Sequence, residues 1–241
     1  MSVERHFQDQ HVVITGGSSG IGRTLARDLA ARGARLTLVG RDLAKLQAAA
    51  ADLGGAAAVA AVDVTDEQAV AALFERMDRL DHLVTAAAGT ARGTVMEMEV
   101  AAARALFESK YWGQYHCAKY AAAKLAATGS IVMFSGWISR KPMAGVSTLA
   151  AVDAAIEALG RTLALEIAPR RVNVVTPGMI DTPLWGARMS LEQQREHFAK
   201  VGRSLPVGRA GTAEDIAHAV RFLLENGFTT GAVIDVDGGQ R

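Results

Sequence analysis

The chain has 241 residues, half of them hydrophobic, and its 26 Lys and Arg residues against 25 Asp and Glu residues give a formal net charge of +1. This length and hydrophobic content suit one large α/β domain, and the balanced charge gives no electrostatic reason to expect nucleic acid or a membrane surface as a partner. The single cysteine excludes an internal disulfide, and neither a transmembrane stretch nor the apolar core of a signal peptide is present, so we expect a cytoplasmic protein.

Short apolar runs alternate with helical patterns along the whole chain. The runs do not alternate strongly between apolar and polar residues, as is typical of strands covered on both faces. This order predicts a single α/β domain over residues 1–241, with a doubly wound parallel sheet of the Rossmann type. The predicted strands are residues 11–15, 35–39, 56–61, 81–86, 129–135, 170–176 and 232–237. The predicted helices are residues 21–32, 42–52, 66–78, 97–126, 147–168, 190–201 and 212–225.

The first strand runs into the glycine-rich stretch Thr15–Gly22, which leads directly into the first helix. Glycines let the backbone turn tightly and approach a pyrophosphate, and the free N–H groups of the helix then point at the anion. A bare turn is the alternative, but the strand before and the helix after favour phosphate binding. The loop residues expected to contact a cofactor are Gly16, Ser18, Ser19 and Ile21.

The second strand is followed by Gly40 and Arg41. An NAD-binding half of this kind usually presents an acid there, which holds the ribose 2′-hydroxyl. A guanidinium suits a 2′-phosphate instead, so the substitution favours NADP(H) over NAD(H) as the cofactor. The alternative is that Arg41 is a solvated residue before a helix that Asp42 caps.

The third and fourth strands each end in a segment that could face a cofactor. Asp63 and Val64 end the third strand, where Asp63 could accept an adenine amino group, and a local turn hydrogen bond explains it equally well. Thr65 with Gln68 predicts a capping box for the next helix. The fourth strand is followed by residues 86–89, whose small side chains leave room for a flat ring beside the backbone.

These segments resemble those of the short-chain dehydrogenase/reductase family, and the resemblance covers nearly the whole chain. Thr15–Gly22 is similar to the family's Thr-Gly-x-x-x-Gly-x-Gly loop, and Asp63-Val64 is similar to its adenine-contacting pair. Residues 86–89, which include Ala87 and Gly89, stand for its Asn-Asn-Ala-Gly turn with both asparagines lost. The resemblance implies a Rossmann-type oxidoreductase that binds a nicotinamide cofactor.

The C-terminal third of the chain carries the remaining matches. Residues 177–182 resemble the family's segment that holds the nicotinamide carboxamide, which implies contacts from Ile180 and Thr182. Further similar segments are residues 171–173, 208–209, 214–217 and 237–239.

The chain departs from the family at the catalytic positions. With the helix at 150–165 as anchor, the family's catalytic tyrosine aligns with Leu149 and its lysine with Asp153. The serine position holds Gly136, with Ser135 beside it, and the asparagine position on the preceding helix holds Lys110. All four catalytic positions therefore differ from the family pattern.

This departure changes the chemistry that the site can perform. Carbonyl reduction needs a proton donor at the developing alkoxide, and a leucine can neither donate nor accept a proton. We expect Lys110 and Asp153 to form a buried or half-buried ion pair, the alternative being two unrelated surface residues. Close pairing would lower the pKa of Asp153 unless desolvation dominates. Lys110, Ser135 and Asp153 are the candidate catalytic residues.

Residues 183–206 follow the nicotinamide-contacting turn and, by resemblance, form a mobile lid over the substrate. His197 on this lid is a candidate acid or base because its reference pKa is near neutral, although such a residue is more often only polar. The large side chains expected at the walls of the site indicate a bulky apolar or aromatic small molecule as substrate; they are Trp112, Trp137, Met143 and Trp185.

Three functions stay open on the sequence alone. The first is an NADP(H)-dependent oxidoreductase acting on a bulky carbonyl, imine or alcohol, with water, His197 or the Lys110 and Asp153 pair as proton source. The second is an isomerase or cyclase that keeps the cofactor without a redox step, and the third is a non-catalytic sensor or structural subunit. Fold analogy favours the first. The family pairs the helices at 97–126 and 147–168 across a twofold axis, and their small residues favour a homodimer or homotetramer.

Overall fold

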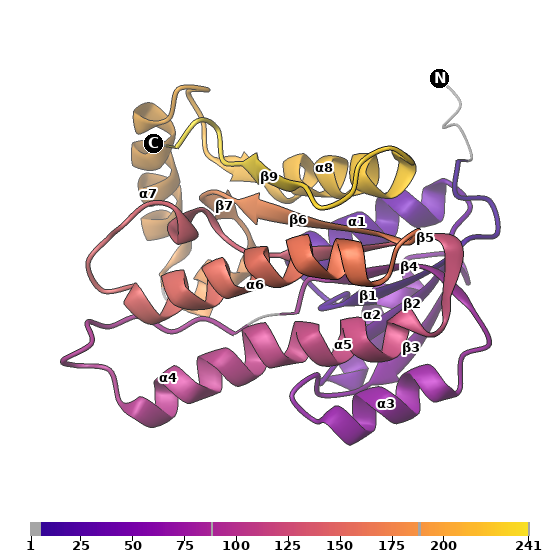
Figure 1. The fold of residues 1–241 in the computed structure, drawn as a ribbon. Helices are drawn as coiled ribbons and strands as arrows, with labels where there is room; N and C mark the ends of the chain where they lie inside the picture. The colour runs from indigo at the N-terminus through magenta and orange to yellow at the C-terminus, as the bar shows by residue number, and fades with distance from the viewer. Residues whose placement is uncertain (1–5, 88, 188, 241) are drawn as a thin grey trace.

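The computed structural model describes residues 6–87, 89–187 and 189–240, and Figure 1 shows helices covering both faces of one sheet. The sheet has seven strands in the order β3-β2-β1-β4-β5-β6-β9. Each neighbouring pair of strands runs parallel, so the carboxyl ends of all strands lie at one edge. The predicted doubly wound parallel sheet is confirmed. Ala88 and Arg188, which belong to the predicted ring-binding turn and lid, lie outside the described residues.

The strands follow the apolar runs of the sequence closely. β5 begins at Leu125 rather than at residue 129, because Leu125 pairs with Leu80 before the register shifts. The strands of the sheet are β1 His11–Thr15, β2 Arg35–Gly40, β3 Ala57–Ala61, β4 Leu80–Thr85, β5 Leu125–Phe134, β6 Arg171–Pro177 and β9 Val233–Val236. A separate parallel pair, β7 Ile180–Asp181 and β8 Gly211–Thr212, was not predicted because each strand is too short to show a pattern.

The helices form two layers, each with its own apolar core against the sheet. One core includes residues of α1, α2 and α8, and the other includes residues of α3, α5 and α6. Within the described ranges, no helix is both long and apolar enough to cross a membrane. The helices are α1 Gly20–Ala31, α2 Leu43–Ala51, α3 Glu67–Glu75, α4 Val100–Phe107, α5 Gly113–Ala122, α6 Ser147–Glu166, α7 Leu191–Ser204 and α8 Ala213–Glu225. Two short 3-10 turns are η2 Trp137–Ser139 and η3 Pro183–Ala187.

The predicted helix at 97–126 is not one uniform helix. A π-helical turn, η1 Glu108–Trp112, joins α4 to α5, and α5 ends at Ala122. Wider turns of this kind are rare and are frequent at functional sites. Here the carbonyl of Lys110 accepts a hydrogen bond from Gln114 Nε2 at 2.9 Å. The π-helical turn therefore contains Lys110, the residue that stands at the family's asparagine position.

The start of α3 also differs from the prediction. Asp66 is the N-cap residue, and its carboxylate accepts a hydrogen bond from the Ala69 N–H at 3.0 Å. The predicted capping box of Thr65 with Gln68 is wrong, because the Thr65 hydroxyl donates to Asp63 Oδ1 at 3.0 Å instead. The expected cap of α2 is confirmed, since Asp42 accepts from the Lys45 N–H at 3.0 Å.

His82 is a buried histidine on β4. Its Nε2 donates to Gln10 Oε1 at 2.9 Å, and its Nδ1 accepts from the Ser130 hydroxyl at 2.8 Å. Burial, together with the positive charge of Arg171, lowers the pKa of His82 from 6.5 to about 4. The neutral ring is therefore the form that the folded protein holds.

We predict that the free energy of unfolding decreases as the pH falls from about 6.5 to about 4. In that window the unfolded chain binds a proton at His82 that the folded chain does not, and the loss should reach roughly 3 kcal/mol. Urea denaturation at a series of pH values measures it. His82→Gln cannot bind this proton, so its unfolding free energy should depend less on pH. Parallel pH profiles in the two proteins would contradict the prediction.

Candidate active site

The glycine-rich turn lies between β1 and α1 at the carboxyl edge of the sheet. Ser19 is the N-cap residue of α1, and its side chain makes no capping hydrogen bond. The first turn of α1 carries no acidic residue that could compete for the N–H groups. Because the first N–H groups of a helix have no intrahelical acceptor, this end of α1 can bind an anion. Ser18 is half-buried, and Ile21 packs partly against the core behind the turn.

The glycines of this turn fit against the segment after β4. Gly16 has a positive φ of 70°, and a Cβ there would come within 2.9 Å of the Ala86 and Ala87 backbone. The Thr15 hydroxyl accepts a hydrogen bond from the Ala87 N–H at 3.1 Å. Gly89 is exposed two residues later, and a Cβ there would meet Ser109 Oγ at 2.7 Å. Only a residue without a side chain fits at position 16, where the contacts are with backbone atoms.

The turn predicted to hold a carboxamide approaches the glycine loop from the other side. A Cβ on Gly20 would lie 3.7 Å from Thr182 Cβ. Ile180 is buried, and its carbonyl accepts a hydrogen bond from Trp185 Nε1 at 3.0 Å. The structure thus brings three predicted cofactor segments together at one edge: the glycine loop, the segment after β4 and the turn at 180–182.

The positions predicted to contact adenosine lie along the same edge. Arg41 is exposed after β2 and makes no hydrogen bond or ion pair with any described residue. The Asp63 carboxylate accepts from the Thr65 N–H at 3.0 Å, so the local turn bond is present. Val64 packs its side chain against Gly113, where a Cβ would come within 2.6 Å of Val64 Cγ2. Its carbonyl accepts from His116 Nδ1 at 3.1 Å. The adenine contact therefore stays a prediction.

Lys110 and Asp153 form an ion pair inside the protein, between η1 and α6, as predicted. Their side chains are only 10% and 1% exposed, which excludes two unrelated surface residues. The Lys110 ammonium also donates to the Ser135 carbonyl at 3.5 Å. A buried charge of either sign would be costly alone, so each side chain depends on the other.

The pKa of Asp153 is raised, which is the outcome expected where desolvation dominates over pairing with Lys110. Burial is the main cause and outweighs the attraction of Lys110, while the negative charge of Glu157 adds to the rise. Desolvation disfavours the charged form of a carboxyl group, and at this depth it is the larger effect. Asp153 is therefore a stronger proton acceptor than a surface aspartate.

The neighbouring positions explain how the pair is accommodated. A Cβ on Gly136 would lie 2.6 Å from Asp153 Oδ2, so the missing side chain leaves the space that the carboxylate uses. Ser135 is buried, and its hydroxyl donates to the Asp153 carbonyl at 2.9 Å rather than to the carboxylate. Leu149 is also buried and belongs to the core of this face.

Gln114 is a residue of the site that the sequence reasoning missed. It is buried, and its amide nitrogen donates to the carbonyls of Lys110 and Phe134 at 2.9 and 2.8 Å. Its amide oxygen accepts from Thr85 Oγ1 at 2.6 Å and from the Phe134 N–H at 2.9 Å. It joins the helix of Lys110 to β4 and β5. The feature of the sequence that could have indicated this role is the position of Gln114 one helical turn after Lys110.

Residues of the predicted lid at 183–206 form an aromatic cluster of their own. Trp185 packs against His197 and Phe198, with ring centroids 5.4 and 5.7 Å apart, and Arg92 Cζ lies 5.9 Å from the centroid of the Trp185 ring. His197 Nε2 is buried and has no hydrogen-bond partner among the described residues. Its role as an acid or base stays a prediction. Trp112 belongs to a different cluster, with Tyr111, Tyr115 and His116.

Comparisons with known proteins agree with this architecture. The family profile described as Enoyl-(Acyl carrier protein) reductase matches residues 16–241. The human 3-oxoacyl-[acyl-carrier-protein] reductase is 34% identical over 239 residues, which cover 96% of this chain and 98% of the relative. Cis-4-hydroxycyclohexanecarboxylate dehydrogenase of Sinomonas cyclohexanicum is 36% identical over 247 residues, which cover 97% of this chain and 97% of the relative.

Solved structures agree equally well. A small-chain dehydrogenase in complex with NADPH is similar with a TM-score of 0.84 and 36% identity, over 96% of this chain and 98% of that one. A short-chain dehydrogenase/reductase from Brucella melitensis has a TM-score of 0.89 and 30% identity, over 98% of both chains. The chain belongs to the short-chain dehydrogenase/reductase family. It is an oxidoreductase of that type.

We predict that the buried pair behaves as one unit in stability. Lys110→Met and Asp153→Leu should each lower the free energy of unfolding by about 3–5 kcal/mol, because each strands a buried charge. The double variant should lose less than either single variant. Chemical denaturation of the four proteins measures this double-mutant cycle.

The exposed ion pair of Lys119 with Glu67 is the matched control. Its two atoms are 2.8 Å apart, but the side chains are 49% and 47% exposed. Removing either partner there should cost less than about 1 kcal/mol. Additive losses at Lys110 and Asp153, as expected for independent residues, would contradict the interpretation of the pair.

Proposed function

We propose that this protein is an NADP(H)-dependent oxidoreductase that acts on a bulky carbonyl, imine or alcohol compound, with the Lys110 and Asp153 pair in place of the family's tyrosine and lysine. The observation that carries the cofactor assignment is the convergence of the glycine loop, the segment after β4 and the turn at 180–182. A Cβ on Gly16 would lie 2.9 Å from the backbone of that segment, which is the close packing that the loop needs.

Each part of the cofactor has residues that suit it. The N-terminal N–H groups of α1 would hold the pyrophosphate, and exposed Arg41 would hold the 2′-phosphate. Asp63 and Val64 would lie beside the adenine, and Ala87 and Gly89 would leave room for the ring next to them. Ile180 and Thr182 would contact the carboxamide. When bound, the cofactor supplies the two-electron chemistry of the family, and a similar dehydrogenase was solved in complex with NADPH.

The side chains around Asp153 favour a substrate that brings its own proton. Leu149, at the position aligned with the family's tyrosine, is buried among apolar side chains and has no proton to give. The Lys110 ammonium is held by Asp153 and by the Ser135 carbonyl. A ketone must receive a proton during reduction, whereas a protonated imine already carries one. Because Leu149 has no proton to give and the Lys110 ammonium is already paired, we propose a protonated imine as the preferred acceptor.

We predict that Arg41→Ala weakens NADPH binding by about 10- to 150-fold, which corresponds to about 1.5–3 kcal/mol for a charge-assisted contact. Binding of NADH, which lacks the 2′-phosphate, should not change. Fluorescence titration with both cofactors measures the two affinities. Arg76→Ala, an exposed arginine at the end of α3, is the control. Equal affinity of the unmodified protein for NADPH and NADH would contradict the assignment.

The reaction itself is tested by single-turnover experiments with bound NADPH and a panel of matched ketones and imines. We predict that the absorbance of the reduced nicotinamide decreases faster with an imine than with the ketone of the same skeleton. Conversion of a substrate without cofactor oxidation would instead support an isomerase or cyclase. No conversion of any panel member would support a non-catalytic NADP(H)-binding protein. Faster oxidation with ketones would contradict the proposed preference for imines.

A further inference from the structure

Glu157 is a second buried carboxylate near the site, and the proposed chemistry does not use it. It lies on α6 one turn after Asp153 and is only 4% exposed. A buried carboxylate is costly unless hydrogen bonds and opposite charges compensate it. The hydrogen-bond and ion-pair partners of Glu157 therefore indicate which part of the structure this carboxylate stabilises.

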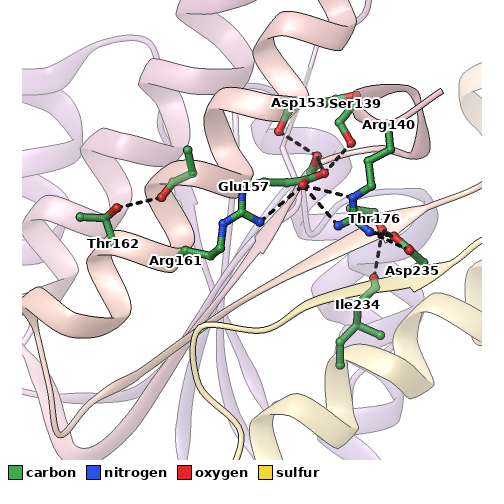
Figure 2. A network of polar contacts seen from close by, with 11 residues as sticks. Ser139, Arg140, Asp153, Glu157, Arg161, Thr162, Thr176, Ile234 and Asp235 are labelled. Carbon is green, nitrogen blue, oxygen red and sulfur yellow. Dashed lines mark hydrogen bonds and ion pairs between the residues drawn. The ribbon is translucent and has the colours of Figure 1, made fainter. Parts of the chain in front are cut away.

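Three partners of Glu157 belong to the segment that joins β5 to α6, residues 135–140. Its Oε1 accepts a hydrogen bond from the Ser139 hydroxyl and lies 3.3 Å from Ser135 Oγ. Its Oε2 accepts from Arg140 Nε and Nη2 at 3.3 and 3.2 Å. On the other side, Arg161 Nη1 lies 3.7 Å from Oε2, and Figure 2 shows Glu157 between these groups. The Glu157 carboxylate thus connects residues 135–140 to α6 through hydrogen bonds.

Residues 135–140 also contact the ion pair of Lys110 and Asp153. Its Ser135 carbonyl accepts the second hydrogen bond of the Lys110 ammonium, at 3.5 Å. Its Gly136 lies against Asp153 Oδ2, at a distance that leaves no space for a side chain. A shift of this segment by about 1 Å would remove the first contact or displace the carboxylate. The geometry of the pair therefore depends on where residues 135–140 are held.

A further ion pair connects Arg140 to β9, the edge strand of the sheet. Arg140 Nη1 donates to both carboxylate oxygens of Asp235 on β9, at 3.0 and 2.8 Å. Asp235 also accepts from the Thr176 hydroxyl on β6. The charged groups around Asp153 then balance, since three cations face three anions: Lys110, Arg140 and Arg161 against Asp153, Glu157 and Asp235.

We propose that Glu157 is the positioning residue of this site. It holds residues 135–140 so that Ser135 and Gly136 keep Lys110 and Asp153 in their paired geometry. The effect on turnover rests on the proposed function, whereas the positioning is a property of the protein without any cofactor. Glu157 acts through the segment and touches neither substrate nor cofactor.

The test compares Glu157→Leu, which removes both charge and hydrogen bonds, with Glu157→Gln, which keeps acceptor capacity for Ser139. In the cofactor-free protein, amide hydrogen exchange of residues 135–141 should become at least about tenfold faster in the leucine variant, because local opening costs less. It should change less in the glutamine variant. Arg161→Ala removes another Glu157 partner without touching the segment, and should leave this exchange unchanged.

A second readout tests the direct effect of the Glu157 charge on Asp153, and turnover separates positioning from mere support of the fold. Carbon NMR of labelled aspartates, assigned with Asp153→Asn, follows the titration of the Asp153 carboxyl group. Glu157→Gln should move its midpoint to lower pH, because a like charge one turn away is removed. In turnover, Glu157→Leu should lower kcat on the order of tenfold with an unchanged NADPH dissociation constant.

Unchanged exchange of residues 135–141 in Glu157→Leu, or an unchanged kcat in that variant, would overturn the proposal. If the leucine variant does not fold, the glutamine variant decides the question, because its residues 135–141 should still exchange faster than in the unmodified protein when Arg140 loses its charged partner. If the unmodified protein turns over no substrate, the proposed function fails, while the exchange experiment still tests the positioning.

Discussion

Lys110 and Asp153 carry opposite charges into the interior at the carboxyl edge of the sheet, and the local structure depends on keeping them paired. The cost of desolvation is visible in the raised pKa of Asp153, which the attraction of Lys110 does not cancel. Neighbouring residues accommodate the buried charges through specific contacts. Gly136 leaves space for the carboxylate, and the Ser135 carbonyl accepts from the ammonium. An exchange at one of these positions alone would leave a clash or an unpaired charge, so we interpret them as one physical unit.

The rest of the fold places this unit at the carboxyl edge of the sheet, where we propose that a cofactor binds. Parallel strands end at one edge, and the α1 N-terminus, the segment after β4 and the turn at 180–182 meet there because glycines permit close contact. Gln114 fixes the carbonyl of Lys110 against the end of β5, and Glu157 fixes the segment that follows β5. The pair is thus held by contacts from α5 and α6 to the end of β5 and to the segment after it.

Much of this could be predicted from the sequence. The buried strands and the glycine loop have strong local patterns, and the pairing of Lys110 with Asp153 followed from two opposite charges at aligned positions. The direction of the Asp153 pKa shift could not be predicted, since it depends on how deeply α6 and η1 bury the group. Glu157 was missed because an acid one turn after another on a helix usually indicates a solvated face. Its hydrogen-bond partners Ser139 and Arg140 belong to a segment without a periodic pattern. β7 and β8 are too short for any pattern to show.

The most direct test of the central claim is NMR of the isotopically labelled, cofactor-free protein, which detects scalar coupling across a hydrogen bond between Lys110 Nζ and Asp153 Cγ. A buried, persistently paired ammonium exchanges its protons slowly enough for this coupling to be observed. We predict that the coupling is present in the unmodified protein and disappears in Asp153→Leu, which has no acceptor. Its absence, together with ammonium protons that exchange as fast as those of exposed Lys119, would show that the pair does not persist and would contradict the account.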